Sequence, residues 1–361
     1  MRLTHIVANL ALLAGFVKAG SRLWEVNPTT ITPDAESFDK RAISIKPSDS
    51  NAGVRRWPDK TITYAYVDKE AEQKLSVILQ GAMTIWQDLD QHGFLYDKIE
   101  MKACKRRRTE CLVIHYNDQG RLRTTVGIQV VEKGNPYVGP TMHLSDREDV
   151  GNLNANINAA HELGHAWGLY HEHQNDKLWG LSDLTNNPAP YLLTGDTFAT
   201  EDYHCDNLKG YEDAHAKMQT AREEGKETAP LTSLCYYSSV AQRYDFDAVD
   251  WMPQDSGEMS WDGTFDPDSL MLYPSGAGGK GDAAPGRDNR LPILTYPDGK
   301  RIPLRRGPST GDTKKLIELY GSQYVPDTEL LNDKSSTMKN RFNKLRNALS
   351  RKGGDTKDGV C

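Results

Sequence analysis

The sequence has no long apolar run beyond its first twenty residues and no excess of basic over acidic side chains. Its N-terminal apolar run, 6–17, is about a dozen residues long, which is too short to span a bilayer, and no later segment approaches that length. With 44 basic and 50 acidic residues, the chain also lacks the concentrated basic face that nucleic acid phosphates require. These absences argue against a membrane span and against nucleic acid as a partner. A content of 37% hydrophobic residues fits one large or two small globular domains.

Cysteine is scarce, and N-glycosylation signals are absent. The only Asn-x-Thr pattern is blocked by proline, at 27–29. In an oxidising compartment, pairing is the default state of cysteines. Cys104 and Cys111 flank a basic, hairpin-like turn and can close a small loop, whereas Cys205 and Cys235 bracket a polar helical segment. Cys361 is left over, and the sequence leaves the connectivity open.

The N-terminus has the pattern of a processed leader. A basic start precedes the apolar run, and small or apolar residues stand at the −3 and −1 positions of a cut after Ala19, so 1–19 is predicted to be a signal peptide rather than a buried helix. The polar segment 20–41 ends in Lys40-Arg41, which favours a propeptide over an ordinary surface pair. We therefore expect a secreted, extracellular protein, made as a zymogen whose new N-terminus is Ala42.

The first half of the chain alternates strand-like and helix-like patterns. Ile62, Tyr64 and Tyr66 alternate as in a half-buried strand, and the segment 70–90 has apolar residues at helical spacing. Further strand-like runs lie at 111–116, 125–131 and 140–145, and 151–169 returns to helical composition. This order predicts an α/β sheet packed by two helices.

The second half is more irregular. Residues 174–265 are rich in polar residues, glycine and proline, with one helical segment around 208–225, and 274–308 is a turn-rich loop. At 309–321, Ser309 and Asp312 have the spacing of a capping box, which predicts a helix that stops at Gly321. The tail 326–361 is polar and basic.

The stretch "HELGHAWGLYHEH", residues 161–173, concentrates the chemistry. His161 and His165 are four residues apart, so on a helix both imidazoles can reach one zinc ion at about 2.0–2.1 Å. Gly168 can take the left-handed conformation that ends a helix, which lets His171 return to the metal. Three neutral imidazoles leave a fourth position open to water, as in catalytic zinc sites.

Two further members of this stretch have different expected roles. Glu162 stands next to the first ligand, well placed to touch a water at the zinc. His173 is one histidine more than the site needs, and we expect it to be a bystander or a supporting group. A polar helix with satisfied histidines is the alternative, and the joint spacing of His161, His165, Gly168 and His171 makes a chance match rare.

A second motif follows about a hundred residues later, in "DPDSLMLYPS" at 266–275. The zinc pattern with a following glutamate, the "SLMLY" turn, the "RWPDKTITY" start, "TVG" at 125–127 and "STGDTKKLIELYG" at 309–321 occur in the order found in the astacin family of metzincin zinc proteases. Over roughly 55–322 the chain resembles that family.

The resemblance implies a fold and a set of roles. The expected fold is α/β (α+β) of metzincin type, with a twisted, mostly parallel sheet, an antiparallel edge strand, two long helices, a zinc cleft and a mostly irregular C-terminal subdomain. It implies a catalytic domain over 42–325, divided near 172, and one catalytic Zn²⁺ held by His161, His165 and His171. It further implies Glu162 as general base, Tyr273 as a switchable fifth ligand and Met271 as a hydrophobic floor. The strand 140–145 resembles the edge strand on which substrates pair.

The chain also departs from the family pattern. His173, Gln174, Asn175 and Asp176 follow the glutamate where the family has Arg and Asp residues, and the spacing to Met271 implies an insertion within 178–262. The family pairs the glutamate corresponding to Glu172 with the mature N-terminus, but Ala42 stands far ahead of Trp57 in sequence, so this pairing is not carried over. These departures indicate a divergent secreted branch, and the dibasic propeptide end favours a fungal source.

The leading hypothesis is a secreted zinc metalloendopeptidase that acts on proteins or peptides through water activated by zinc, with Glu162 as the base. One alternative is a metzincin of another branch, which would lack the role of Tyr273. A second is a catalytically inactive zinc-binding module on the same fold, which loss of Glu162 would mark. The oligomeric state and the cleavage-site preference stay open.

Overall fold

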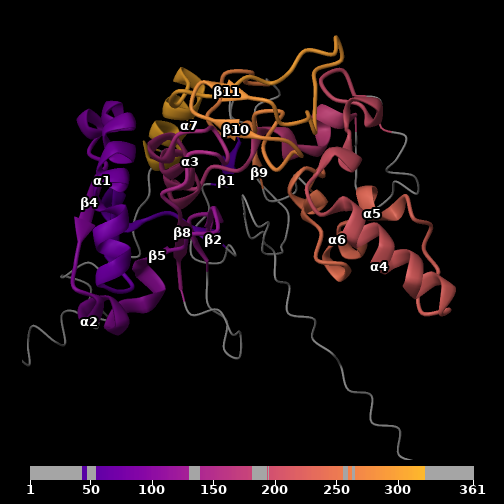
Figure 1. Ribbon diagram of the computed structural model, residues 1–361. Helices are drawn as coiled ribbons and strands as arrows, with labels where there is room; N and C mark the ends of the chain where they lie inside the picture. Colours follow the sequence, from indigo (N-terminus) through magenta and orange to yellow (C-terminus); the bar gives the residue numbers. More distant parts are fainter. Residues whose placement is uncertain are drawn as a thin grey trace, which may run out of the picture. The chain divides into compact units, whose positions relative to one another are not determined.

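A computed structural model describes residues 43–46, 54–129, 139–180, 193, 195–254, 259–261 and 265–321 (Figure 1). The predicted signal peptide, propeptide, Ala42, Cys361 and the tail 326–361 lie outside the described residues. Within the described part, no helix is both long enough and apolar enough to cross a membrane.

The main sheet has five strands in the order β4-β3-β5-β8-β6. Their bounds are β3 Thr61–Tyr66, β4 Leu95–Lys98, β5 Leu112–Tyr116, β6 Arg123–Thr124 and β8 Thr141–Leu144. The pairs β3–β4, β3–β5 and β5–β8 are parallel, and β6 is antiparallel to β8. The protein is therefore mixed α/β with a mostly parallel sheet and an antiparallel strand at one edge.

The strand predicted at 140–145 does not lie at the edge, so that expectation is wrong. The outer side of β8 is occupied by β6, with Thr124 opposite Met142 and Arg123 opposite His143. The backbone N–H of Thr125 continues the ladder by donating to the carbonyl of Thr141, at 3.0 Å. Sequence patterns signal this pairing only weakly, because β6 is two residues long.

Strand β3 is buried on both faces, which corrects the expectation of a half-buried strand. Ile62 belongs to the main core, which also contains residues of α1, Lys69–Ile85, whereas Ala65 packs in a separate small cluster with Val113 and a disulfide. The short helix α2, Met101–Cys104, supplies part of that second cover. A strand in a parallel sheet covered on both faces loses the simple alternation of exposed and buried residues.

The two long helices pack against each other. Helix α1 begins at Asp68, whose carboxylate accepts the N–H of Ala71. Helix α3, Ala155–Trp167, begins at Asn154, and all of its residues except Asn156 are buried. The indole N–H of Trp86 donates to the carbonyl of Ala160 at 2.8 Å, which joins the end of α1 to the middle of α3.

The first described residues lie against the end of α3. Strand β1, Ser44–Ile45, pairs with β9, Met259–Ser260, and the N–H of Ile45 donates to the carbonyl of Gly168 at 2.8 Å. The N–H of Tyr170 donates to the carbonyl of Ile43 at 3.0 Å. Strand β2, Val54–Arg55, pairs with β7, Ile128–Gln129, so only 128–129 of the run expected at 125–131 is in that strand, and 130–131 lie outside the described residues. Residues just after Ala42 are therefore close to the site region despite their distance in sequence from Trp57.

The rest of the chain consists mainly of short helices and turns. The 3-10 helices are η1 Pro58–Lys60, η2 Gln87–His92, η3 Lys105–Glu110, η4 Glu172–Gln174, η5 Asp176–Trp179, η8 Thr200–Asp202, η9 Cys205–Asn207 and η10 Asp247–Asp250. The α-helices are α4 Tyr211–Glu223, α5 Ser233–Tyr236, α6 Ser238–Arg243 and α7 Thr310–Gly321, and β10 Ala283–Ala284 pairs with β11 Arg287–Asp288. Helix α4 matches the helix expected around 208–225.

The predicted capping box is present at the start of α7. The hydroxyl of Ser309 accepts the N–H of Asp312 at 2.9 Å, and the N–H of Ser309 donates to the Asp312 carboxylate, also at 2.9 Å. The same carboxylate accepts the hydroxyl of Ser269 and the N–H of Leu270, each at 2.7 Å. The cap thus ties α7 to the turn that carries Met271.

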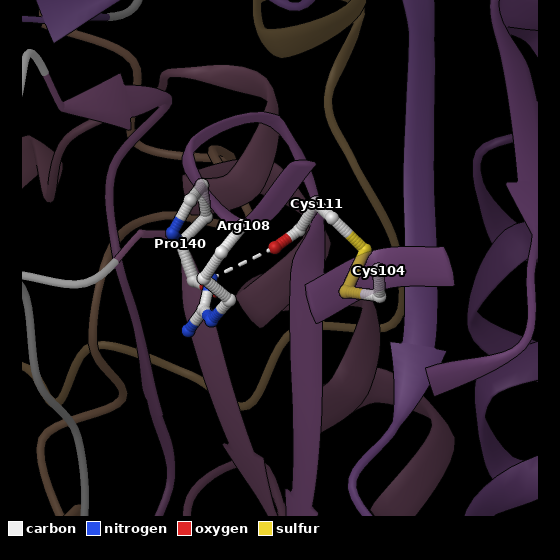
Figure 2. Close-up of a disulfide and its surroundings, with 4 residues drawn as sticks. All are labelled: Cys104, Arg108, Cys111 and Pro140. Atoms are coloured by element: carbon white, nitrogen blue, oxygen red, sulfur yellow. Dashed lines mark hydrogen bonds between the residues drawn. A yellow bond between two sulfur atoms is a disulfide. The ribbon is translucent and has the colours of Figure 1, made fainter. Parts of the chain in front are cut away.

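Both candidate cysteine pairs form disulfides, Cys104–Cys111 and Cys205–Cys235. The expected hairpin between Cys104 and Cys111 is wrong, because α2 and η3 make this segment helical. Figure 2 shows Arg108 beside this disulfide, with its guanidinium donating to the carbonyl of Cys111, at 2.9 Å. The guanidinium also donates to the carbonyl of Pro140, at 2.8 Å. Of the basic run at 105–108, Arg108 is therefore structural, and the other three residues are exposed.

Candidate metal centre

Helix α3 places His161 and His165 one turn apart, and a glycine then reverses the chain. Gly168 ends the helix in the left-handed region, with φ 111°, as predicted. The N–H of Gly168 donates to the carbonyl of His165, at 2.8 Å, which closes the last turn of the helix. A Cβ at Gly168 would stand 3.0 Å from Ile45, so a larger residue would be strained by the backbone and would crowd Ile45. His171 follows directly after this turn.

The three predicted ligands come together. The Nε2 atoms of His161 and His171 are 3.2 Å apart, and those of His165 and His171 are 2.9 Å apart. Among the described residues, this is the one group of three or more potential ligands whose ligand atoms all lie within 4.8 Å of one another. All three side chains are buried, at 0–1% exposure.

Each of these rings is held by its other nitrogen. Nδ1 of His161 is 2.8 Å from the carbonyl oxygen of Leu270, and Nδ1 of His165 is 2.8 Å from that of Leu169. Because a carbonyl oxygen only accepts, both Nδ1 atoms carry the proton. Nδ1 of His171 is 2.7 Å from Oε1 of Gln174.

The orientation of the Gln174 amide is fixed by its other end. Its Nε2 faces the carbonyls of Val249, at 3.4 Å, and Met252, at 3.3 Å, so Oε1 is the atom left for His171. His171 therefore carries its proton on Nδ1 as well. The three unprotonated Nε2 atoms therefore lie close together.

Such a group fits a metal ion. Unprotonated nitrogens about 3 Å apart repel one another, and a cation between them removes the repulsion. Burial lowers the pKa of His161 and His171 well below their usual value and that of His165 to about 3, so the rings stay neutral and able to bind metal. Zinc in proteins is commonly bound by one imidazole nitrogen while the N–H of the other ring nitrogen donates to an oxygen.

Met271 and Tyr273 border the three histidines. The sulfur of Met271 lies 2.6 Å from the position that a Cβ on Gly164 would take, so it packs directly against α3 beside His165. The ring of Tyr273 has its centroid 4.3 Å from that of His171 and 5.8 Å from that of His161. Both side chains are buried, at 1% exposure.

Glu162 lies beside the histidines with an unusual environment. It is fully buried, and its two carboxylate oxygens make no hydrogen bond to any described residue. Burial raises its pKa to about 8, opposed by the nearby Thr124 hydroxyl and by the charge of Arg123. No hydrogen bond joins Thr124 to Glu162, and the buried Thr124 hydroxyl also has no partner among the described residues.

His173 and Glu172 lie outside the group of three nitrogens. His173 donates from Nε2 to the carbonyl of Asp250 at 3.0 Å, and its ring lies 5.3 Å from that of His171 and 4.6 Å from that of Tyr273. The carboxylate of Glu172 accepts the N–H of Asp266 at 2.9 Å, which holds the start of the 266–275 motif.

Sequence reasoning did not find Thr124, or Gln174 as a partner of His171. Thr124 stands just before "TVG", and Gln174 is the third residue after His171, where a single turn of η4 returns its side chain to the ring. Gln174 could have been found from the sequence, because it is a long polar side chain one turn beyond the predicted ligand His171. The Leu270 and Leu169 carbonyls carry no sequence signal, because every residue has one.

No protein-family model matches the sequence, and no curated protein matches it either. Among solved structures, the chain is similar to High choriolytic enzyme 1, a hatching enzyme zinc-protease from the medaka fish Oryzias latipes, with 14% sequence identity and a TM-score of 0.38. The similarity covers 78% of this chain and all of that one. At this level the likeness decides neither fold nor chemistry, and the site is interpreted from its own residues.

Proposed function

We propose that this protein is a zinc-dependent metalloendopeptidase of the metzincin type, which hydrolyses peptide bonds in proteins or peptides. The observation that carries the proposal is the convergence of three buried histidine Nε2 atoms, each with its Nδ1–H held by an oxygen. A zinc ion bound there would supply a Lewis acid and lower the pKa of water at its open position.

In this proposal, Glu162 handles the proton. Its carboxylate lies next to His161 in sequence, is shielded from solvent and has no partner within the described protein. It accepts a proton as water attacks the peptide carbonyl and then passes it to the leaving amine.

Tyr273 and Met271 serve the same centre in different ways. The Tyr273 ring lies against His171, from where its hydroxyl donates a hydrogen bond to the oxygen that gains charge in the transition state. Met271 packs under Gly164 and supports the helix turn that carries His165. The resemblance of the "SLMLY" stretch to the family's turn supports both roles.

We further propose that the protein is secreted as a zymogen and processed after Arg41. Its two disulfides agree with an oxidising compartment. Ile43, Ser44 and Ile45 are buried, at 1–2% exposure, and the segment is hydrogen-bonded to Gly168 and Tyr170. Cutting after Arg41 therefore creates a chain end directly before a segment packed beside His171.

The decisive test is a comparison of the wild type and Glu162→Gln, both secreted, processed and loaded with zinc. We expect the variant to keep one zinc per chain and to lose at least about 100-fold in peptide hydrolysis, because only the proton carrier is removed. Hydrolysis at the wild-type rate with zinc bound would rule out this mechanism. Wild-type protein that binds zinc and cleaves no member of a broad peptide library would favour the inactive zinc-binding module instead.

A further inference from the structure

Residues 247–254, called the 247–254 segment, lie against the chain just after His171. The segment comprises η10 and the residues that follow it, within the stretch expected to be an insertion. Its Asp250 carbonyl accepts from His173, and the N–H of Gln254 donates to the carbonyl of Gln174 at 2.7 Å. Gln254 also forms a parallel bridge with Asn175. Three consecutive residues after the site are therefore held by one segment.

Gln174 connects this segment to His171. Its carboxamide is buried, at 2% exposure, with the oxygen on Nδ1 of His171 and the nitrogen toward the carbonyls of Val249 and Met252. An amide is the neutral side-chain group of this length that can accept at one end and donate at the other. A purely apolar contact at this place would leave a buried imidazole N–H unpaired.

The three histidines differ in what accepts the proton on Nδ1. His161 and His165 are held by backbone carbonyls, whereas His171 depends on a side chain that itself depends on the 247–254 segment. If the Gln174 oxygen is removed, no other hydrogen bond within the described part of the chain holds the His171 proton on Nδ1. The ring is then free to put its proton on Nε2, the atom that must be bare to bind a metal.

We propose that Gln174 is a positioning residue, which fixes the tautomer and direction of His171 and makes metal affinity depend on the 247–254 segment. This rests on the proposed metal site but not on peptide hydrolysis. Oxygen acceptors on ligating histidines typically change metal affinity by about 10- to 100-fold when they are removed. The inserted segment thereby becomes part of the metal site without supplying a ligand.

The test measures zinc affinity of the processed protein by competition with a chromophoric chelator. Gln174→Met keeps the size of the side chain and removes the acceptor, and we expect affinity to fall about 10- to 100-fold. Gln174→Glu keeps an acceptor for His171, and when protonated it also keeps a donor for Val249 and Met252. We expect it to stay within about threefold of the wild type, as a rescue of the acceptor function.

Asn158→Leu is the matched control. Asn158 is a fully buried amide on α3 that accepts the N–H of Asn152 at 2.8 Å and donates to the carbonyl of Val150 at 3.1 Å. Its loss perturbs the fold in a comparable way without touching His171, so zinc affinity should stay within about threefold of the wild type. Equal losses in Gln174→Met and Asn158→Leu, or an equal loss in Gln174→Glu, would overturn the proposal.

A second measurement determines the tautomer of each histidine directly. It uses metal-free protein, and its main result comes from the wild type alone. Nitrogen-15 NMR of the histidines in metal-free wild-type protein should show all three site rings with the proton on Nδ1, and Gln174→Met should lose this signature in one ring only. A His171 with its proton on Nε2 in the wild type contradicts the proposal even if no variant folds. Protein that meets these expectations but cleaves no peptide would refute the proposed peptidase and leave the role of Gln174 intact.

Discussion

Met271 lies directly under Gly164: its sulfur is 2.6 Å from the position that a Cβ on that glycine would occupy. The glycine in "HELGH" is thus a contact residue, since any side chain there must displace Met271 or tilt α3. The following residue, His165, is one of the three converging histidines, so the displacement acts directly on the site.

Gly164→Ala should therefore weaken both fold and metal site. We expect a loss of about 1–3 kcal/mol in the free energy of unfolding of the metal-free protein, measured in urea, together with lower zinc affinity. Gly81→Ala on α1 is the control: its Cβ would meet only the exposed side chain of Asn156, which can rotate away. That change should be neutral or stabilise by up to about 1 kcal/mol. Unaltered zinc affinity in Gly164→Ala would contradict the proposed role of Met271 as a support.

Gly168→Ala should act through the turn that returns His171. Alanine at φ 111° is strained, and its Cβ would also press on Ile45. We expect an unfolding free energy lower by more than about 2 kcal/mol and a clear loss of zinc affinity. Gly225→Ala, at φ 69° and with open space around it, should cost only about 1–2 kcal/mol and leave zinc binding unchanged. Equal effects at both glycines would argue against the turn as the means of placing His171.

Tyr273→Phe separates transition-state stabilisation from metal binding. The ring packing on His171 and His173 is kept, so zinc affinity should remain within a few-fold of the wild type. Loss of the hydroxyl should lower kcat by about 100- to 1000-fold if it donates to the oxyanion. Steady-state kinetics with one peptide substrate checks this, and an unchanged kcat would remove Tyr273 from the proposed mechanism.

The stacked histidines of the sheet predict a pH dependence of stability. His143 and His115 are register partners on β8 and β5, with ring centroids 4.6 Å apart, and the pKa of His143 is lowered to about 4, first by burial and then by His115 and nearby arginines. Between pH 6.5 and 4 the unfolded chain binds a proton at this position and the folded chain does not, so stability falls as pH falls through this window. His143→Phe should remove about 1–3 kcal/mol of that fall, measured by urea unfolding of metal-free protein at about pH 7 and pH 4. Parallel pH profiles for the two proteins would show that His143 does not contribute.

Arg108 and Arg107 allow a test within one basic run. Arg108→Met removes the donor shared by the carbonyls of Cys111 and Pro140 and should lower the free energy of unfolding by about 1–3 kcal/mol. Arg107 is exposed, and Arg107→Met should change it by less than about 0.5 kcal/mol. Thermal unfolding with the disulfides intact measures both. Equal changes in the free energy of unfolding for the two variants would mean that the basic run 105–108 acts only through its charge.

Local patterns predicted the parts of the fold whose signals are local. The caps at Ser309 and Gly168 could be predicted because each depends on a few adjacent residues. The spacing of His161 and His165 follows the helix period, and Gly168 indicated the turn that returns His171. The interior position of strand β8 could not be predicted, because it depends on pairing with β6. Strand β6 is only two residues long and leaves no recognisable strand pattern in the sequence. The support of His171 by Gln174 required knowing that the 247–254 segment returns to the site.

The contact between His161 and the Leu270 carbonyl sets an order of events during synthesis. The histidines of α3 leave the ribosome about a hundred residues before Leu270, and also well before Val249 and Met252, which at roughly 5–20 residues per second is a delay of about 5–20 s. Through that interval the growing chain has its three imidazoles, but it lacks the acceptor of His161 and the two carbonyls that orient Gln174 toward His171. A chain interrupted before residue 270 carries the whole "HELGHAWGLYHEH" stretch and still has no finished centre.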